Sequence, residues 1–239
     1  MNRAVDVLLV GAGGIGHPAA LGLAAAGTGS LLIVDDDQVE LSNLHRQILF
    51  RDEDVGRSKP EALAGALSSR FPALAVTVLP GRILPDTALD RVSRARVVVD
   101  ATDNFASRFL IADACRIAGV PVVHAAAVKW RATVIAVPAE GRPCYRCLFE
   151  DIPREDAPDC ATAGVAGPVC GVAGALAADR AMRILAGDAS AFGSIVTYDG
   201  RGDRLREVRV AARPGCPLCG EGRTITTITP DRYEAYDCS

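Results

Sequence analysis

The sequence predicts an α/β fold in which helices alternate with the strands of a doubly wound, mostly parallel sheet. Two observations support this prediction. Short apolar runs, typical of strands buried on both faces, alternate with helical segments through the first half of the chain. The first run, Val5–Val10, ends in a glycine-rich turn that opens an Ala-rich helix. A chain of 239 residues, 49% of them hydrophobic, can bury one large core.

The expected elements follow this alternation. Strands are predicted at residues 5–10, 31–34, 75–79, 96–99, 121–126 and 133–137, and helices at about 16–26, 61–70, 86–93 and 106–118. After Pro138 the pattern changes to a long apolar helix from about Pro168 to Leu185, followed by strand-like segments at 194–198 and 204–210. We therefore expect a single domain over residues 1–220, whose sheet has a C-terminal antiparallel extension, and a tail over residues 221–239.

Composition and charge exclude several classes of function. The formal net charge is −3, no run of Lys or Arg is present, and aromatic residues make up 5%. Such a chain lacks the basic surface and the stacking side chains of proteins that bind nucleic acids or anionic membranes. No segment resembles a membrane span, and Met1–Asp6 enters a strand at once without the regions of a signal peptide. We therefore expect a cytoplasmic protein.

The glycine-rich turn after the first strand indicates a nucleotide site. Gly11 allows a tight turn, Gly13 lets the backbone approach a phosphate, and Gly16 lets the helix pack on the sheet. Asp35 ends the second strand, where an acidic residue meets ribose hydroxyls in Rossmann-like folds. Taken alone, this pattern favours an NAD-dependent oxidoreductase.

Two cations after the ribose position change that interpretation. Arg46 lies in Leu41–Gln47, together with Asn43, and Lys59 ends the segment Val55–Lys59. Hydride transfer needs no such pair, whereas nucleotidyl transfer does, because negative charge shifts onto the leaving pyrophosphate. Either residue alone would be interpreted as a solvated surface charge; at this spacing the pair favours a triphosphate site.

Asp103 follows the fourth strand, at the edge where open α/β sheets bind ligands. A carboxylate there can hold Mg²⁺ between phosphates, or it can cap the helix that begins after it. We expect Asn104 to cap this helix and Asp103 to face the ligand, with Asp37 as a weaker second carboxylate.

Four of the eight cysteines form two CxxC pairs, Cys144/Cys147 and Cys216/Cys219. Four thiolates in this pairing form a closed tetrahedral Zn²⁺ site, so we expect a structural zinc clip made of four cysteines; two separate redox pairs are the alternative. Cys160 precedes the long helix, where it is either a nucleophile or a bystander in a loop.

The other cysteines and histidines are assigned no chemistry. Cys115 and Cys170 fall within helices, where we expect buried apolar packing. His17 and His124 have no partner pattern and are interpreted as packing residues.

Taken in order, these motifs resemble the ThiF/MoeB/HesA family, the bacterial relatives of ubiquitin-activating enzymes. The resemblance extends from about residue 5 to 220. It is carried by GxGGxG at 11–16, Asp35, SNLxRQ at 42–47, VGxxK at 55–59, ATDN at 101–104, and the segments CYRC, CATAG and CPLC.

The resemblance implies that Mg·ATP is used to adenylate the C-terminal glycine carboxylate of a small ubiquitin-like sulfur carrier. Such a carrier is similar to ThiS or MoaD, ends in Gly-Gly, and serves thiamine, molybdopterin or a specialised thio-metabolite pathway. Asp35 would hold the ribose, Asn43, Arg46 and Lys59 the phosphates, and Asp103 the Mg²⁺. The nucleotide-binding residues implied in this way are Gly11, Gly13, Gly14, Gly16, Asp35, Asp37, Ser42, Asn43, Arg46, Gln47, Lys59, Asp103 and Asn104.

The resemblance also implies partners. Cys160 matches the family cysteine that takes the activated acyl group or a persulfide, which calls for a sulfur donor such as a cysteine desulfurase or a rhodanese. A homodimer is implied as well. Family members usually carry a leading segment with an arginine that reaches the partner subunit's ATP site; here the first strand begins at about residue 5, and Arg3 lies too close to it for that role. A non-catalytic partner subunit of the same fold is the remaining alternative, although it would be expected to lack Arg46, Lys59 and Asp103.

Overall fold

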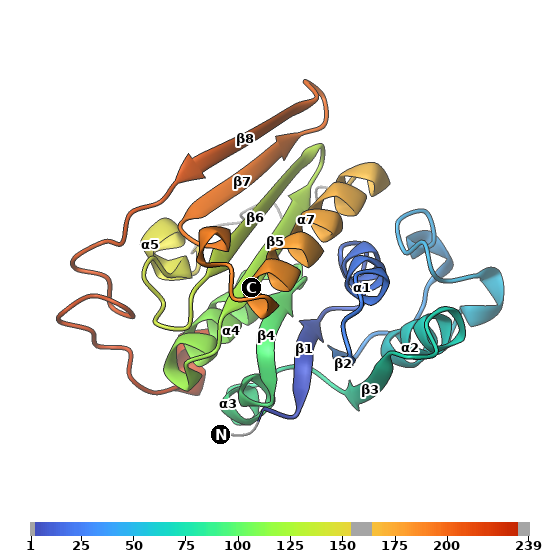
Figure 1. The fold of residues 1–239 in the computed structure, drawn as a ribbon, viewed down its shortest axis with the longest axis horizontal. Coiled ribbons are helices and arrows are strands. Elements are labelled where there is room, and N and C mark those ends of the chain that lie inside the picture. The colour runs from blue at the N-terminus through green and yellow to red at the C-terminus, as the bar shows by residue number, and fades with distance from the viewer. Residues whose placement is uncertain (1–2, 154–163, 234–239) are drawn as a thin grey trace, which may run out of the picture.

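One sheet of eight strands runs through the molecule (Figure 1), in the order β3-β2-β1-β4-β5-β6-β7-β8. A computed structural model describes residues 3–153 and 164–233 of the chain. The strands are β1 (Val5–Val10), β2 (Ser30–Asp35), β3 (Ala75–Pro80), β4 (Ala95–Asp100), β5 (Val122–Val128), β6 (Arg131–Val137), β7 (Ser194–Asp199) and β8 (Arg204–Arg209).

The strands from β1 to β5 pair in parallel, and those from β5 to β8 pair antiparallel. The predicted fold class is therefore confirmed, including the antiparallel extension. The chain leaves β1 toward β2 and β3 and then returns to β4 on the other side of β1. This reversal of strand order opens a crevice at the carboxyl ends of β1 and β4, the usual place for a ligand in such sheets.

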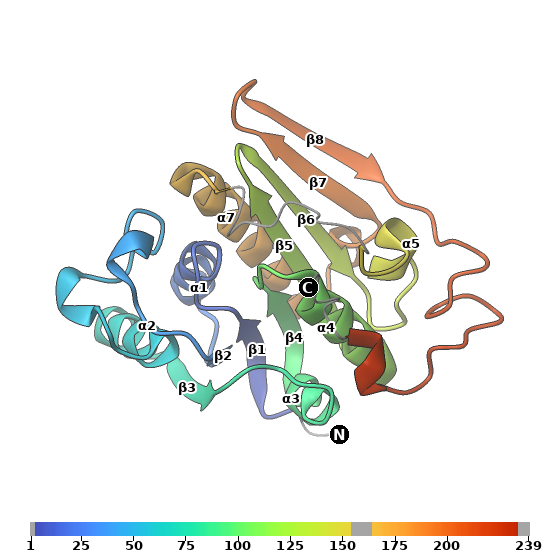
Figure 2. The same cartoon turned by 180° about the vertical axis from the view of Figure 1, so that it is seen from behind.

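Helices cover both faces of the sheet (Figures 1 and 2). Helices α1, α2 and α7 pack on one face, and α3, α4 and α5 pack on the other. Their bounds are α1 (Gly16–Ala25), α2 (Lys59–Arg70), α3 (Ala88–Ser93), α4 (Phe105–Ala118), α5 (Tyr145–Phe149) and α7 (Gly167–Leu185). None of the helices in the described part of the chain is long and apolar enough to cross a bilayer.

Helices α1 and α7 touch almost backbone to backbone. A Cβ atom on Gly174 of α7 would lie 2.6 Å from the carbonyl oxygen of Ile15 and 2.7 Å from the backbone nitrogen of Ala19. Glycine at this position therefore sets the approach of α7 to α1, which carries the glycine-rich turn at its start.

The expected elements are present, with ends that differ by a few residues. The short helix α5 was not predicted, since its five residues within the first CxxC segment are too few to show a helical period. The long strand β6 begins at Arg131, two residues before the predicted start.

A buried ion pair joins α4, α5 and the tail on one face of the sheet. Arg146 of α5 donates from Nε and Nη2 to the two carboxylate oxygens of Asp113 on α4, at 2.9 Å each. Tyr233 of the tail donates its hydroxyl to Asp113 Oδ2 at 2.8 Å. The guanidinium of Arg146 also lies over the ring of Phe109, 4.7 Å from its centroid. The tail, for which the sequence offered no account, therefore closes over α4 as far as it is described.

Candidate nucleotide and zinc sites

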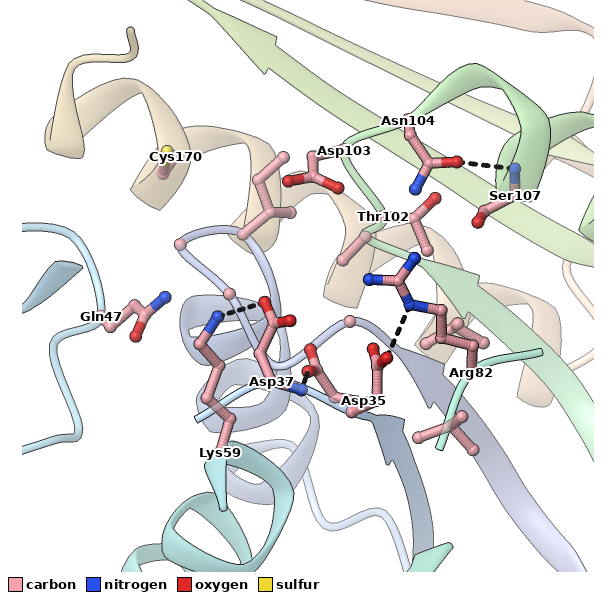
Figure 3. Close-up of a pocket in the computed structure, with 18 of the residues that line it drawn as sticks. Asp35, Asp37, Gln47, Lys59, Arg82, Thr102, Asp103, Asn104, Ser107 and Cys170 are labelled. Carbon is pink, nitrogen blue, oxygen red and sulfur yellow. Dashed lines mark hydrogen bonds and ion pairs between the residues drawn. The ribbon is translucent and has the colours of Figure 1, made fainter. Parts of the chain in front are cut away.

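A cavity of about 190 Å³ opens where the strand order reverses (Figure 3). The turn after β1, the ends of β2 and β4, and the segment before α2 all contribute walls. Ten of the residues predicted for a nucleotide site line it, namely Gly11, Gly13, Gly14, Asp35, Asp37, Arg46, Gln47, Lys59, Asp103 and Asn104. The structure therefore brings together side chains and glycines that lie far apart in the sequence.

The glycine turn has the geometry that its sequence predicts. Gly11 has a φ of +97°, and a Cβ there would lie 2.8 Å from the carbonyl oxygen of Ala101. A Cβ on Gly13 would meet nothing within 4 Å, so this position leaves room for a ligand. Gly16 does not line the cavity; a Cβ on it would lie 2.1 Å from the carbonyl oxygen of Gly11, so glycine is needed to pack the helix start on the turn.

Asp35 braces the turn in addition to facing the cavity. Its Oδ2 accepts a hydrogen bond from the backbone N–H of Ala12 at 2.7 Å, and its Oδ1 accepts one from Asp37 at 2.8 Å. Burial raises the pKa of Asp35, although these hydrogen bonds oppose the rise. Each carboxylate oxygen has a second lone pair, so Asp35 can still accept hydrogen bonds from ribose hydroxyls.

Lys59 is held at the cavity by an ion pair with a residue of the neighbouring segment. Its Nζ lies 2.6 Å from Oδ2 of Asp37, as Figure 3 shows. The Lys59 side chain is 8% exposed and that of Asp37 is 54% exposed. A buried ammonium paired with an exposed carboxylate can keep that partner while its other donors contact an anionic ligand.

Arg46 lines the cavity and is positioned by Asn43, which lies outside it. Its Nη2 donates to Oδ1 of Asn43, and both Asn43 and Ser42 donate to Oε2 of Glu40 at 3.1 Å. Neither Ser42 nor Asn43 lines the cavity. Asn43 therefore holds Arg46, while Ser42 shares the Glu40 carboxylate with Asn43. The Arg46 side chain packs on Gly14, because a Cβ on that glycine would lie 3.1 Å from Arg46 Cγ.

At the start of α4, two neighbouring residues take different places. Asn104 Oδ1 accepts a hydrogen bond from the backbone N–H of Ser107 at 2.8 Å and so caps the helix. Asp103 is exposed and lines the cavity. The cap by Asn104 is the one predicted from the sequence, and the contact of Asp103 with a ligand stays a prediction.

Two charged residues that line the cavity, Asp36 and Arg82, were not predicted from the sequence. Arg82, which follows β3, donates from Nε to Oδ2 of Asp36 at 2.6 Å, and both residues line the cavity (Figure 3). Their position just beyond the ends of β2 and β3 is the signal that could have found them. Cys170 is buried in α7, as expected, but its side chain also lines this cavity.

The two CxxC pairs come together on the other face of the sheet. The Sγ atoms of Cys144 and Cys147 lie 3.8 Å apart, and those of Cys144/Cys216 and Cys147/Cys219 lie 3.4 Å apart. Four sulfurs around a tetrahedral Zn²⁺ are separated by about 3.8 Å, since each Zn–S bond is ~2.3 Å. The backbone N–H of Arg213 donates to Cys147 Sγ at 3.3 Å. The donor set and its spacing therefore fit zinc.

Repulsion between the four cysteine thiolates also favours a bound cation at this position. Burial and the neighbouring thiols of Cys219 and Cys147 raise the pKa of Cys144. Burial acts the same way on Cys216, but two backbone N–H groups of its own CxxC turn lower its pKa to about 7. Four thiolates in so small a space repel one another, and a divalent cation removes that repulsion.

Cys160 lies outside the described residues, as does Cys238, and neither is placed relative to the cavity.

Comparisons with known proteins agree with this geometry. The ThiF family model matches residues 2–218. The chain is 42% identical over 218 residues to the SAMP-activating enzyme E1 of Haloferax volcanii, covering 90% of this chain and 80% of the relative. It is also 42% identical over 216 residues to the sulfur carrier protein ThiS adenylyltransferase of Escherichia coli, covering 90% of this chain and 86% of the relative.

Among solved structures, the fold is similar to that of E. coli MccB crystallised with ATP. The TM-score is 0.79 at 25% sequence identity, covering 91% of this chain and 67% of MccB. With a family match that runs almost from end to end, relatives above 40% identity and the glycine turn, cations and cysteines in their expected places, this chain belongs to the ThiF family.

Proposed function

We propose that this chain is an adenylyltransferase that uses ATP to activate the C-terminal carboxylate of a ubiquitin-like sulfur carrier. The observation that carries the proposal is the convergence of Arg46, Lys59 and Asp103 on one cavity above the glycine turn. The names of the relatives support it, since the E. coli relative is a ThiS adenylyltransferase.

The proposed reaction suits the side chains of the cavity. The carboxylate of the carrier attacks the α-phosphorus of ATP, an acyl-adenylate forms, and pyrophosphate leaves. The nucleophile is already ionised, so no general base is required, and the task of the enzyme is to position the reactants and to neutralise charge. Arg46 would donate to phosphate oxygens in a fork, and Lys59 would act on them as a point charge.

Asp103 is the residue that we propose for Mg²⁺, with Asp37 as a second carboxylate. Mg²⁺ prefers oxygen ligands and keeps several waters, which suits carboxylates that are exposed at the edge of a cavity. When bound, the ion would offset the charge of the phosphates. Asp103 would hold it beside the crevice, while Asp37 stays paired with Lys59.

The cysteine cluster is proposed to bind zinc in a structural role. Four thiolates complete a tetrahedron and leave no open position for a water or a substrate. The clip would hold α5 to the segment that follows β8.

The later steps of the proposed function involve partners. We propose that Cys160 takes the activated acyl group or sulfur, and that a cysteine desulfurase or a rhodanese supplies the sulfur. A homodimer is proposed as well. The dimer is supported by large apolar side chains that are exposed on the segment beside the nucleotide cavity. Among them, Leu41 is 67% exposed and Ile48 is 59% exposed.

The experiment is ATP–pyrophosphate exchange with the E. coli ThiS carrier. Lys59→Met should slow exchange by about 10²–10³-fold, as for other lost charge stabilisers. Lys129→Met is the matched control, because Lys129 is the only other lysine of the chain, is exposed and lies outside the cavity. No exchange with any carrier ending in Gly-Gly, in a protein that binds ATP, would refute the proposal. Tight binding of NAD in place of ATP would favour the oxidoreductase alternative.

A further inference from the structure

A second cavity, of about 150 Å³, lies on the face of the sheet that packs against α4 and α5, over β5 and β6. Figure 2 shows these two helices on the same side. Because side chains alternate along a strand, His124 and Ala126 of β5 line this cavity while Ala127 lines the nucleotide cavity. The two cavities share one residue, Asp103. The second cavity therefore adjoins the nucleotide cavity.

The walls of this cavity are mainly apolar, and they include the polar side chains of Asp103, Arg108, His124 and Thr133. Phe105, Ile135 and Phe149 supply aromatic and aliphatic surface. His124 is 2% exposed, and its Nδ1 lies 2.7 Å from Oδ2 of the fully buried Asp100. The pair was not foreseen from the sequence, which gave His124 only a packing role.

The partner of Nδ1 fixes the role of Nε2. Burial alone would raise the pKa of Asp100, but the charge of Arg108 and the hydrogen bond from His124 outweigh it, so the pKa lies below its ordinary value. An ionised carboxylate only accepts hydrogen bonds, so the proton lies on Nδ1 of His124. In the neutral imidazole Nε2 is then a lone-pair acceptor.

Nε2 of His124 is buried and has no hydrogen-bond partner among the residues that the structure describes. Leaving a buried acceptor unpaired is unfavourable, and such groups are rare enough in folded proteins to call for an explanation. A donor supplied by a ligand in the adjoining cavity would satisfy it.

On the basis of the proposed function, we propose that this cavity seats the end of the carrier tail and that Nε2 of His124 accepts a hydrogen bond from one of its backbone N–H groups. A cavity of about 150 Å³ takes a ligand the size of benzene, and a glycine residue, with fewer heavy atoms, fits the same space. Every peptide unit other than one at proline offers an N–H donor. His124 is then a specificity-determining residue that favours a chain of small residues with a free amide.

The test replaces single amide N–H groups by ester oxygens in semisynthetic E. coli ThiS, at the last and at the second-last residue. In the wild-type enzyme, one of the two esters should lower kcat/KM for the carrier about 3- to 10-fold, the usual effect of one hydrogen bond. The variant His124→Asn keeps an amide donor for Asp100 and lacks Nε2. With the native carrier, this variant should have a kcat/KM about 3- to 10-fold below that of the wild type. The ester should not lower its kcat/KM further, and its KM for ATP should stay unchanged.

A second variant keeps the test informative if His124→Asn unfolds. His124→Gln places an amide oxygen near the position of Nε2, so sensitivity to the ester should return. An ester effect in His124→Asn as large as in the wild type, no ester effect in the wild type, or loss of the ester effect in His124→Gln would overturn this inference alone. Absence of exchange with the native carrier would overturn the proposed function and this inference with it.

Discussion

His17 provides a pH-dependent test of how the nucleotide cavity is held together. It is fully buried in α1, its Nδ1 accepts a hydrogen bond from the backbone N–H of Leu49 at 3.1 Å, and its ring meets that of Phe50 edge to face, with the centroids 4.2 Å apart. These contacts fasten the segment that carries Arg46 to the helix after the glycine turn. Burial lowers the pKa of His17 from 6.5 to about 3.

The size of the effect follows from linkage between folding and protonation. Between pH 6.5 and 3 the unfolded chain binds a proton at His17 that the folded chain does not bind, so folding is favoured above pH 6.5 and loses stability as the pH falls. The slope is about 1.4 kcal/mol per pH unit. From pH 7.5 to pH 5, this residue alone should lower the free energy of unfolding by about 2 kcal/mol.

The assay is urea unfolding at pH 7.5 and at pH 5, followed by circular dichroism, for the wild type, His17→Gln and His45→Gln. His45 is an exposed histidine of the same segment and serves as the matched control. The wild type and His45→Gln should lose about 2 kcal/mol more between the two pH values than His17→Gln does. An equal loss in all three proteins would show that the folded protein accepts the proton at His17, and the reasoning from burial would be wrong.

Three further perturbations test other parts of the structure. Gly11→Ala, at a positive φ and 2.8 Å from the Ala101 carbonyl, should lower the free energy of unfolding by about 1–3 kcal/mol, whereas Gly13→Ala, which meets no atom within 4 Å, should leave stability near wild type in urea unfolding. Tyr233→Phe removes the hydrogen bond to buried Asp113 and should destabilise the protein by about 1.5–3 kcal/mol; an unchanged urea midpoint would mean that the tail is not docked. Elemental analysis should find one zinc per chain, and its removal by a chelator should lower the melting temperature; a chain that purifies without zinc and melts at the same temperature would contradict the clip.

The parallel strands β1, β2, β4 and β5 could be predicted because they are buried on both faces. Such strands appear in the sequence as short continuous apolar runs, and the residues that follow them gather at one edge. This rule predicted Asp35 and Asp103 at the nucleotide site, and the spacing of Arg46 and Lys59 predicted those two residues there. All four line the cavity. The zinc clip could be predicted because two CxxC pairs supply the four thiolates of a closed tetrahedral zinc site.

What the sequence did not reveal depends on contacts between distant elements. Arg82 meets Asp36 across 46 residues, and Tyr233 meets Asp113 across 120, so no local pattern records either pair. His124 was interpreted as a packing residue because its partner Asp100 lies on the neighbouring strand. A local pattern shows which residues form an element, but not which side chains of two elements meet.

The buried contacts of α5 have a consequence for the order in which the protein is completed during synthesis. The helix carries Tyr145, which lines the second cavity, and Arg146, and it is fastened by thiols at 216 and 219 and through Asp113 to Tyr233. Strands β1 to β5 and the glycine turn emerge from the ribosome well before those anchors. A nascent chain can therefore assemble the parallel core before the wall of the second cavity is fixed.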